Sequence, residues 1–154
     1  MSNYIKLECR ANTENELMVR YMVGFFLSTI NPTINELTEI KTIISEAMIN
    51  SIIHGYENRE GIVKLHCMIK DNNIIIQVSD TGIGIEDIDT AKEPLYTSKP
   101  NLERSGMGFT IMQSFMDELN IESVLNLGTK VTMRKVIKHN LKENSEQSNM
   151  CITA

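Results

Sequence analysis

Hydrophobic residues recur along this chain with two different periods, and the shorter period marks strands. Residues 4–11 and 63–70 alternate apolar and polar side chains, which is the pattern of strands with one buried face, and residues 74–79 are a run of β-forming residues. The second and third runs are separated by a turn-forming Asp-Asn-Asn sequence, so they are expected to pair as an antiparallel hairpin. Two closing strands are predicted at 121–126 and 129–137.

The longer period, of three to four residues, predicts three helices. The first follows a Thr-Glu-Asn-Glu capping sequence and ends at about Thr29. The second runs from about Asn35 to His54, and the third from Gly106 to about Leu119. One stripe of the first helix is expected to be buried, and it consists of Leu17, Met18, Tyr21, Met22 and Phe25.

The order of these elements indicates the fold class. Strands joined by short turns favour antiparallel pairing, and residues 86–105 form a loop long enough to suggest a functional role. The predicted fold is α/β, a two-layer sandwich with a mostly antiparallel sheet and helices on one face. We expect one domain over residues 1–138 and a polar, frayed tail over 139–154.

Composition narrows the class of protein. The chain has 154 residues, 42% of them hydrophobic, which suits one packed domain. A net charge of −5 disfavours direct nucleic-acid binding by phosphate neutralisation. No apolar run could form a signal peptide or cross a membrane, so a cytoplasmic location without membrane contact is predicted. The three cysteines lack metal-site spacing and are expected to be reduced thiols.

The second predicted helix carries three polar residues at four-residue intervals, Glu46, Asn50 and His54, so they share one helical face. Asn50 offers a neutral oxygen to a hard cation such as Mg²⁺, and Glu46 could accept a proton from a hydroxyl group. The spacing alone is more typical of a solvated polar stripe, so this motif needs support from others.

A glycine-containing loop, Asp-Thr-Gly-Ile-Gly-Ile, follows the strand at 74–79 directly. Asp80 at the strand end could accept a hydrogen bond from the amino group of adenine, and a carboxylate in that place would reject the guanine carbonyl. Gly82 and Gly84 allow a ligand to approach the backbone closely. A simple hairpin turn is the alternative. An aspartic protease would need two such aspartates in an all-β protein, which this sequence does not indicate.

A second pair of glycines, Gly106 and Gly108, stands where the long loop meets the third helix. Free backbone N–H groups at a helix start form an anion site, and glycines let phosphate groups come close. A flexible loop end would show the same two residues. No lysine follows in the manner of a Walker motif.

Taken in order, these three motifs resemble the GHKL superfamily of ATPases and kinases. The resemblance implies that ATP and Mg²⁺ are bound, with residues 86–105 as a lid over the nucleotide. It assigns the metal to Asn50 and the adenine to Asp80, supported by Thr129. It places Gly82 and Gly84 on the nucleotide floor and Gly106 and Gly108 at the phosphates. Histidine kinases of this superfamily are disfavoured, because no histidine here has the sequence setting of a phosphoacceptor.

Two stretches, residues 31–56 and 93–117, are similar to the anti-sigma serine kinases of endospore-forming bacteria, above all to the anti-sigma F factors of sporulation. The resemblance covers about residues 4–138. It implies a homodimer that binds and inhibits a sporulation sigma factor. It also implies phosphorylation of a serine on an anti-anti-sigma protein. The general-stress branch of the family, a binding module without kinase activity, and a fragment of a larger hydrolase are the alternatives.

Three residues receive roles from this second resemblance. Glu46 would take the proton of the substrate serine, and Arg104 would stabilise charge on the γ-phosphate. Arg104 could equally be a solvated lid residue. Arg20 on the first helix would contact both protein partners, although a simple helical pair with Glu16 explains its position equally well.

Overall fold

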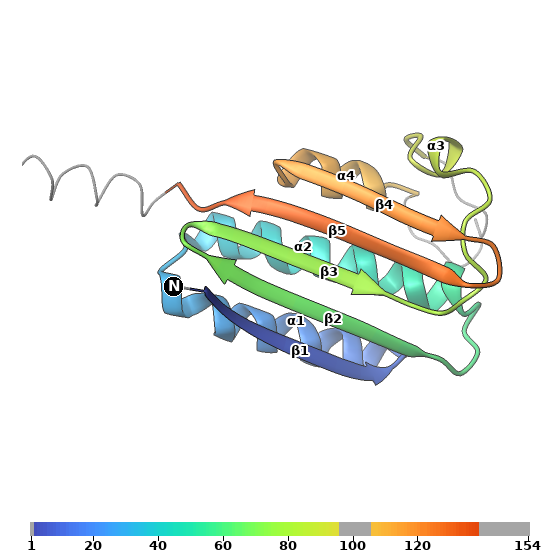
Figure 1. Cartoon of the computed structure of the whole chain (residues 1–154), viewed down its shortest axis with the longest axis horizontal. Coiled ribbons are helices and arrows are strands. Elements are labelled where there is room, and N and C mark those ends of the chain that lie inside the picture. Colours follow the sequence, from blue (N-terminus) through green and yellow to red (C-terminus); the bar gives the residue numbers. More distant parts are fainter. Residues whose placement is uncertain (1, 96–105, 139–154) are drawn as a thin grey trace, which may run out of the picture.

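The computed structural model describes residues 2–95 and 106–138, and these build one antiparallel sheet with helices against it. The predicted frayed tail, residues 139–154, lies outside the described residues. The strands are β1 (Ser2–Arg10), β2 (Ile62–Lys70), β3 (Asn73–Ser79), β4 (Glu118–Val124) and β5 (Gly128–Val136). Their order across the sheet is β1-β2-β3-β5-β4, and every neighbouring pair is antiparallel (Figure 1).

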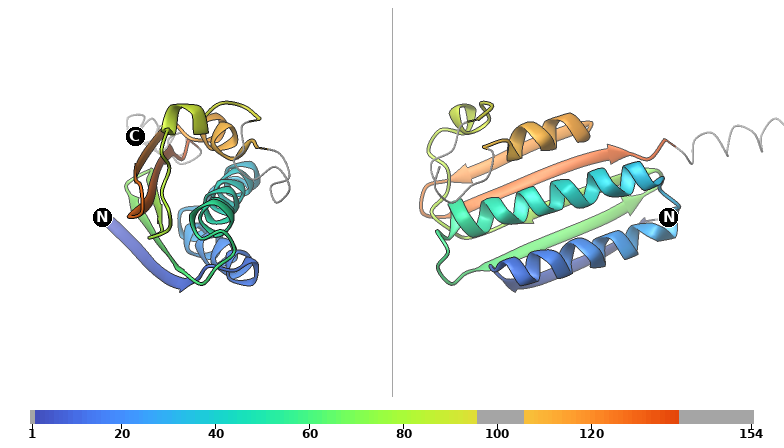
Figure 2. Two further views of the ribbon diagram at one scale, coloured as in Figure 1. Left: turned by 90° about the vertical axis from the view of Figure 1, so that its right-hand side faces the viewer. Right: turned by 180° about the vertical axis from the view of Figure 1, so that it is seen from behind.

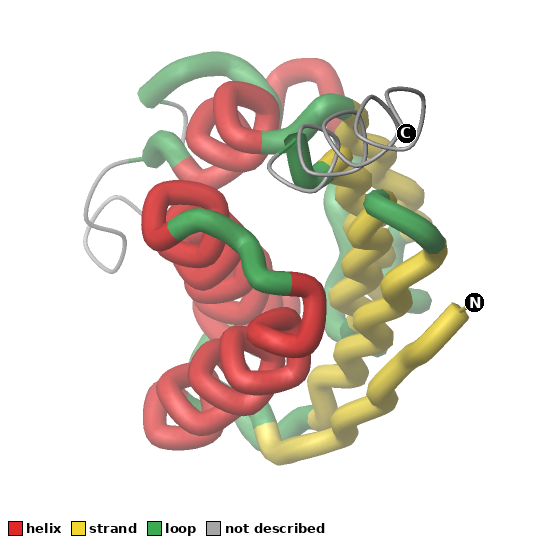
Figure 3. Tube along the Cα trace, turned by 90° about the vertical axis from the view of Figure 1, so that its left-hand side faces the viewer, coloured by secondary structure: helices red, strands yellow, loops and turns green. Residues whose placement is uncertain are grey.

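The helices lie on one face of this sheet, as Figures 2 and 3 show, and no described helix covers the other face. They are α1 (Thr13–Leu27) with a short 3-10 turn (Ser28–Ile30), α2 (Ile34–Asn50) with a π-helical turn (Ser51–Gly55), α3 (Ile88–Ala91) and α4 (Gly108–Phe115). The predicted two-layer α/β sandwich is therefore confirmed. No helix in the described part of the chain is both long and apolar enough to span a membrane.

Helix α2 lies along the middle of the sheet and supplies much of the core. Its start is fixed by a capping box, in which the Thr33 hydroxyl accepts the Glu36 amide and the Glu36 carboxylate accepts the Thr33 amide at 2.8 Å. Its buried side chains pack against the inward positions of the strands; they are Ile40, Ile43, Ile44, Ala47 and Met48. Each buried large aliphatic side chain contributes roughly 1.5–3 kcal/mol, which holds this helix firmly in register.

The prediction for the first helix is wrong about its buried face. The five residues expected in the core are exposed, and Phe25 retains 83% of its accessible surface. Val19, Val23 and Leu27 face the sheet instead. Apolar residues surround most of this helix, so periodicity could not distinguish the two faces. The cap also differs, because Asn12 rather than Thr13 accepts the amide of Asn15, at 2.8 Å.

The predicted end of the third helix is also wrong. Helix α4 ends at Phe115, and Leu119 belongs to strand β4. Met116 is already extended, and the Asp117 carboxylate accepts the Val136 amide at 2.7 Å, which ties the new strand to β5. From residue 118 onward polar and apolar positions alternate, and this period-two pattern overrides the helical one.

Candidate functional site

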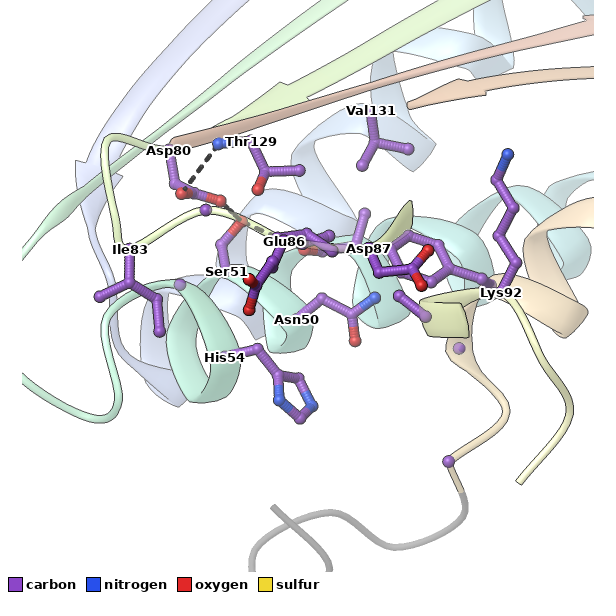
Figure 4. A pocket seen from close by; sticks show the side chains of 18 of the residues that line it. Asn50, Ser51, His54, Asp80, Ile83, Glu86, Asp87, Lys92, Thr129 and Val131 are labelled. Atoms are coloured by element: carbon purple, nitrogen blue, oxygen red, sulfur yellow. Dashed lines mark hydrogen bonds between the residues drawn. The ribbon is translucent and has the colours of Figure 1, made fainter. Parts of the chain in front are cut away.

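A cavity of about 400 Å³ lies between the C-terminal part of α2, the loop after β3 and the start of α4 (Figure 4). This volume is typical of a site for a small organic ligand. Much of its wall is apolar and consists of Ala47, Ile83, Ile85, Phe109, Leu125 and Val131. Polar side chains project among these, and those of Asp80, Asn50 and Thr129 are labelled in Figure 4. An apolar wall with directed polar groups beside it suits a flat, partly polar ring.

Asp80 is the most constrained polar residue of this cavity, with only 8% of its surface exposed. Its Oδ1 accepts the backbone N–H groups of Gly82 at 2.9 Å and Thr129 at 3.3 Å. Its Oδ2 accepts the hydroxyl of Ser51 at 2.8 Å. Figure 4 shows this carboxylate between the end of the sheet and the π-helical turn. Three donors thus fix a buried acceptor at one end of the cavity.

The glycine loop after β3 lies directly against the π-helical turn. Ile83 donates its backbone N–H to the Gly55 carbonyl at 2.9 Å. A Cβ atom on Gly82 would lie 2.2 Å from the same oxygen, so only glycine permits this approach. Gly84 has a φ of +75° and lines the cavity. The predicted floor residues are therefore beside the cavity, with Gly82 acting through Asp80 and Gly55.

Thr129, a residue of strand β5, lies next to Asp80 and lines the cavity. Its hydroxyl is 2.8 Å from that of Ser123, which also accepts the Ile85 amide at 2.8 Å. The Thr129 carbonyl accepts the Asp80 amide at 2.9 Å. The predicted pair of Asp80 and Thr129 is thus brought together by strand pairing.

Glu46 and Asn50 meet the start of α4 at another part of the site. A Cβ atom built on Gly108 would lie 3.2 Å from Asn50 Oδ1 and 3.2 Å from Glu46 Oε2. No described side chain caps α4, so its first backbone N–H groups stay available to an anion. Gly106, with a φ of +62°, also lines the cavity. A carboxylate, a carboxamide and a helix N-terminus therefore converge here.

The helix changes from α to π geometry directly after Asn50, a feature often found at functional sites. Tyr56 donates its amide to the Ser51 carbonyl at 2.9 Å and closes this turn. Of the three residues predicted to share one face of this helix, His54 and Asn50 line the cavity (Figure 4), whereas Glu46 does not. The Tyr56 hydroxyl accepts the Thr81 amide at 2.9 Å and so anchors the glycine loop as well.

The described lining is rich in acids. It contains four carboxylates, those of Asp80, Glu86, Asp87 and Glu93, against the single lysine Lys92. Hydrogen bonds from the Thr90 hydroxyl and amide hold the pKa of Asp87 below its usual value. Among the residues that the structure describes, no three His, Cys, Asp or Glu side chains form a metal-binding group. A metal ion in this cavity would need further oxygen ligands from the phosphate groups of a molecule bound beside it, as is common for Mg²⁺.

Sequence reasoning missed several residues that position the site. Ser51 belongs to none of the predicted motifs, yet its hydroxyl donates a hydrogen bond to Asp80. Ser123 and Tyr56 were not singled out, although each holds part of the glycine loop. Their partners are far along the chain, so no local pattern could have revealed them. Lys92 was also overlooked.

Four predicted residues do not line the described cavity. Glu46 and Gly82 lie beside it, Glu46 next to Gly108 and Gly82 bonded to Asp80. Arg104 lies outside the described residues, as does most of the expected lid. Arg20 is on α1, where its Nε lies 3.3 Å from Glu16 Oε1 and its guanidinium 5.6 Å from the Tyr21 ring. The helical pair with Glu16 therefore exists in this structure, beside an exposed apolar surface.

The sequence pattern of the histidine kinase-like ATPase domain family matches residues 9–135 of this chain. An anti-sigma F factor of Clostridium kluyveri is 56% identical over 134 residues, which are 87% of this chain and 94% of that protein. Anti-sigma F factors of Clostridium novyi and Geobacillus kaustophilus are 53% and 51% identical, covering 88% and 89% of this chain and 96% and 94% of those proteins.

Solved structures share the fold at lower identity. A structure of the RsbU and RsbW domains of a Mycobacterium tuberculosis protein aligns with a TM-score of 0.59 and 16% identity, over 88% of this chain and 32% of that one. A blue-light activated histidine kinase of Erythrobacter litoralis aligns with a TM-score of 0.55 and 24% identity, over 73% of this chain and 34% of that one. Such structures support the architecture described above.

Proposed function

We propose a function from one premise, which is that the chain belongs to the histidine kinase-like ATPase domain family and, within it, to the anti-sigma F factors. The chain binds ATP, transfers its γ-phosphoryl group to a serine of an anti-anti-sigma protein, and binds and inhibits a sporulation sigma factor. The observation that carries this proposal is the convergence of Glu46 and Asn50 on the start of α4, in the same site as the buried Asp80.

Asp80 reads the adenine. Its carboxylate can only accept hydrogen bonds, which suits the amino group of adenine and opposes the guanine carbonyl. The apolar wall beside it, including Ile83 and Val131, packs against the faces of the ring. Thr129 and Gly84 border the same region. The four carboxylates of the described lining repel a polyphosphate, so its binding requires a cation that compensates the negative charge.

The phosphate groups lie at the start of α4, where Gly106 and Gly108 leave room and free backbone N–H groups favour an anion. Asn50 Oδ1 is the protein ligand for Mg²⁺, which when bound neutralises charge on the phosphates. The Glu46 carboxylate accepts a hydrogen bond from the attacking serine hydroxyl and then takes its proton. Arg104 remains our candidate for a further positive charge there. In this mechanism the protein contributes mainly positioning and charge compensation.

The partner proteins bind on α1. This helix carries an exposed apolar surface, which we term the α1 face and which consists of Leu17, Met18, Tyr21, Met22 and Phe25. A contiguous exposed apolar surface is typical of a site where another protein binds. Arg20 borders the α1 face, and its guanidinium is a suitable partner for a carboxylate on another protein. We place the sigma factor and the anti-anti-sigma protein in this region. The protein itself is proposed to be a cytoplasmic homodimer.

Incubation with γ-labelled ATP and a purified anti-anti-sigma protein tests the transfer. We expect label on the partner that is stable to acid and lost in alkali, as phosphoserine is. Acid-labile label would indicate histidine chemistry instead. Nucleotide binding without transfer would reduce the protein to an ATP-dependent binding module.

Arg20→Glu tests the partner surface separately. Partner binding should fall sharply while ATP affinity stays at the wild-type value, because Arg20 is not part of the described cavity lining. Lys64→Glu is the matched control, since Lys64 is also a cation paired with a glutamate, Glu8 at 3.3 Å, but lies on a strand. Equal partner binding by both variants would place the docking surface elsewhere.

A further inference from the structure

Ser51 is the one side chain among the described residues that donates a hydrogen bond to Asp80; the other two donors are backbone amides. The residues are 29 positions apart, and both are buried, with 5% of Ser51 and 8% of Asp80 exposed. The bond of 2.8 Å joins the π-helical turn to the end of strand β3. We propose that Ser51 is a positioning residue for base recognition, and that it leaves the Asp80 carboxylate with a single acceptor site toward the nucleotide.

A count of hydrogen-bond sites gives this result. A carboxylate has about four lone-pair sites, two on each oxygen. On Asp80, Oδ1 accepts the amides of Gly82 and Thr129, so both of its sites are in use. Oδ2 accepts the Ser51 hydroxyl and keeps one site. One N–H group of a ligand can therefore bond to this carboxylate, and a second cannot.

This count matters for the choice of base. The amino group of adenine needs one acceptor and meets it at Oδ2. Guanine could avoid its carbonyl mismatch by turning its N1–H and N2–H groups toward a carboxylate, but that arrangement needs both oxygens. Here the amides occupy Oδ1, and Ser51 holds Oδ2 in a fixed orientation. The hydroxyl proton of Ser51 is committed to Asp80, so Ser51 itself offers the cavity acceptor sites only.

The local structure explains why Ser51 can reach. Ser51 is the first residue of the π-helical turn, directly after Asn50, and its hydroxyl is also 3.3 Å from the Ala47 carbonyl. A hydroxyl has one proton, and the 2.8 Å contact with a charged oxygen is the stronger of the two. Loss of this donor leaves Asp80 with two backbone bonds, of which one is 3.3 Å long, so the carboxylate can change its orientation.

The test compares ATP with purine riboside triphosphate, which lacks the amino group. It rests on the proposed function, because the wild type must bind ATP. We would measure the dissociation constants of both nucleotides by equilibrium titration, for wild type and for Ser51→Ala. The readout is the dissociation constant of the purine riboside triphosphate divided by that of ATP. A hydrogen bond to a charged group changes affinity about tenfold or more, so we expect the ratio to fall by about fivefold or more in the variant. Preference for ATP over GTP should narrow as well.

Two further variants guard the interpretation. Ser114→Ala makes the same chemical change at an exposed position of α4, where the hydroxyl donates to the Ile111 carbonyl, and should keep the wild-type ratio. Ser51→Cys keeps a weak donor of similar shape, and its ratio should lie between wild type and alanine. It also serves if Ser51→Ala does not fold.

The possible outcomes distinguish failure of the positioning role of Ser51 from failure of the proposed function. A folded Ser51→Ala that loses affinity equally for both nucleotides, with an unchanged ratio, overturns the positioning role and leaves Ser51 a structural residue. A wild type with no preference for the amino group overturns both this role and the adenine assignment of Asp80. A wild type that binds no nucleotide overturns the proposed function itself.

Discussion

Replacement of Gly108 by alanine should separate stability from phosphoryl transfer. Gly108 is the first residue of α4, and its φ is not in the left-handed region. Alanine is the better helix former, by up to about 1 kcal/mol. The added Cβ, however, would lie 3.2 Å from both Asn50 Oδ1 and Glu46 Oε2. Both side chains must then shift by a few tenths of an ångström.

The two effects oppose each other in the free energy of unfolding but not in catalysis. We expect the net stability to change by at most about 1 kcal/mol, which is about 2–4 °C in melting temperature for a domain of this size. Displacement of a catalytic group by 1 Å can cost about 100-fold in rate, so a smaller shift of both groups should slow transfer about tenfold.

Thermal unfolding and transfer of γ-labelled phosphate, measured on the same preparation, provide the assay. Gln113→Ala is the control, since Gln113 is an exposed position of the same helix, and both its transfer rate and its ATP binding should be unchanged. If Gly108→Ala transferred phosphate at the wild-type rate, Glu46 and Asn50 would not be the transfer groups. A fall of more than about 10 °C in melting temperature would instead make Gly108 a structural residue.

Three other predictions follow from the same geometry. Glu46→Gln should retain ATP binding and lower the transfer rate by about 100-fold, and near-normal phosphorylation would remove Glu46 from the mechanism. Asp80→Asn presents an N–H group where the adenine amine needs an acceptor, so ATP affinity should fall about tenfold or more and the preference over GTP should narrow; titration with both nucleotides checks this. Burial raises the pKa of the Cys67 thiol to about 12, so Cys67 should stay protonated at pH 8 and react with a thiol reagent only on unfolding. Rapid labelling of Cys67 in the folded protein would contradict its burial.

The strands could be predicted closely because their inward positions strictly alternate. Strand β2, for example, buries Val63, Leu65, Cys67 and Ile69 in turn, and the sequence shows the same period. The face of α1 could not be predicted, since apolar residues stand on both sides of that helix and only contact with the sheet selects one. The end of α4 was missed for a related reason, because residues 116–119 fit a helical pattern until β5 offers strand pairing.

The same physics explains which parts of the site the sequence could indicate. Glu46, Asn50 and Asp80 stand in short motifs, because a metal ligand, a base or an acceptor requires a particular residue type at a fixed local spacing. Ser51 belongs to no such motif. Its role is defined by Asp80, 29 residues away, and that of Thr129 by the same carboxylate, 49 residues away. Reactive groups can therefore be proposed from sequence, whereas the residues that orient them become visible only once the sheet and α2 have brought distant segments together.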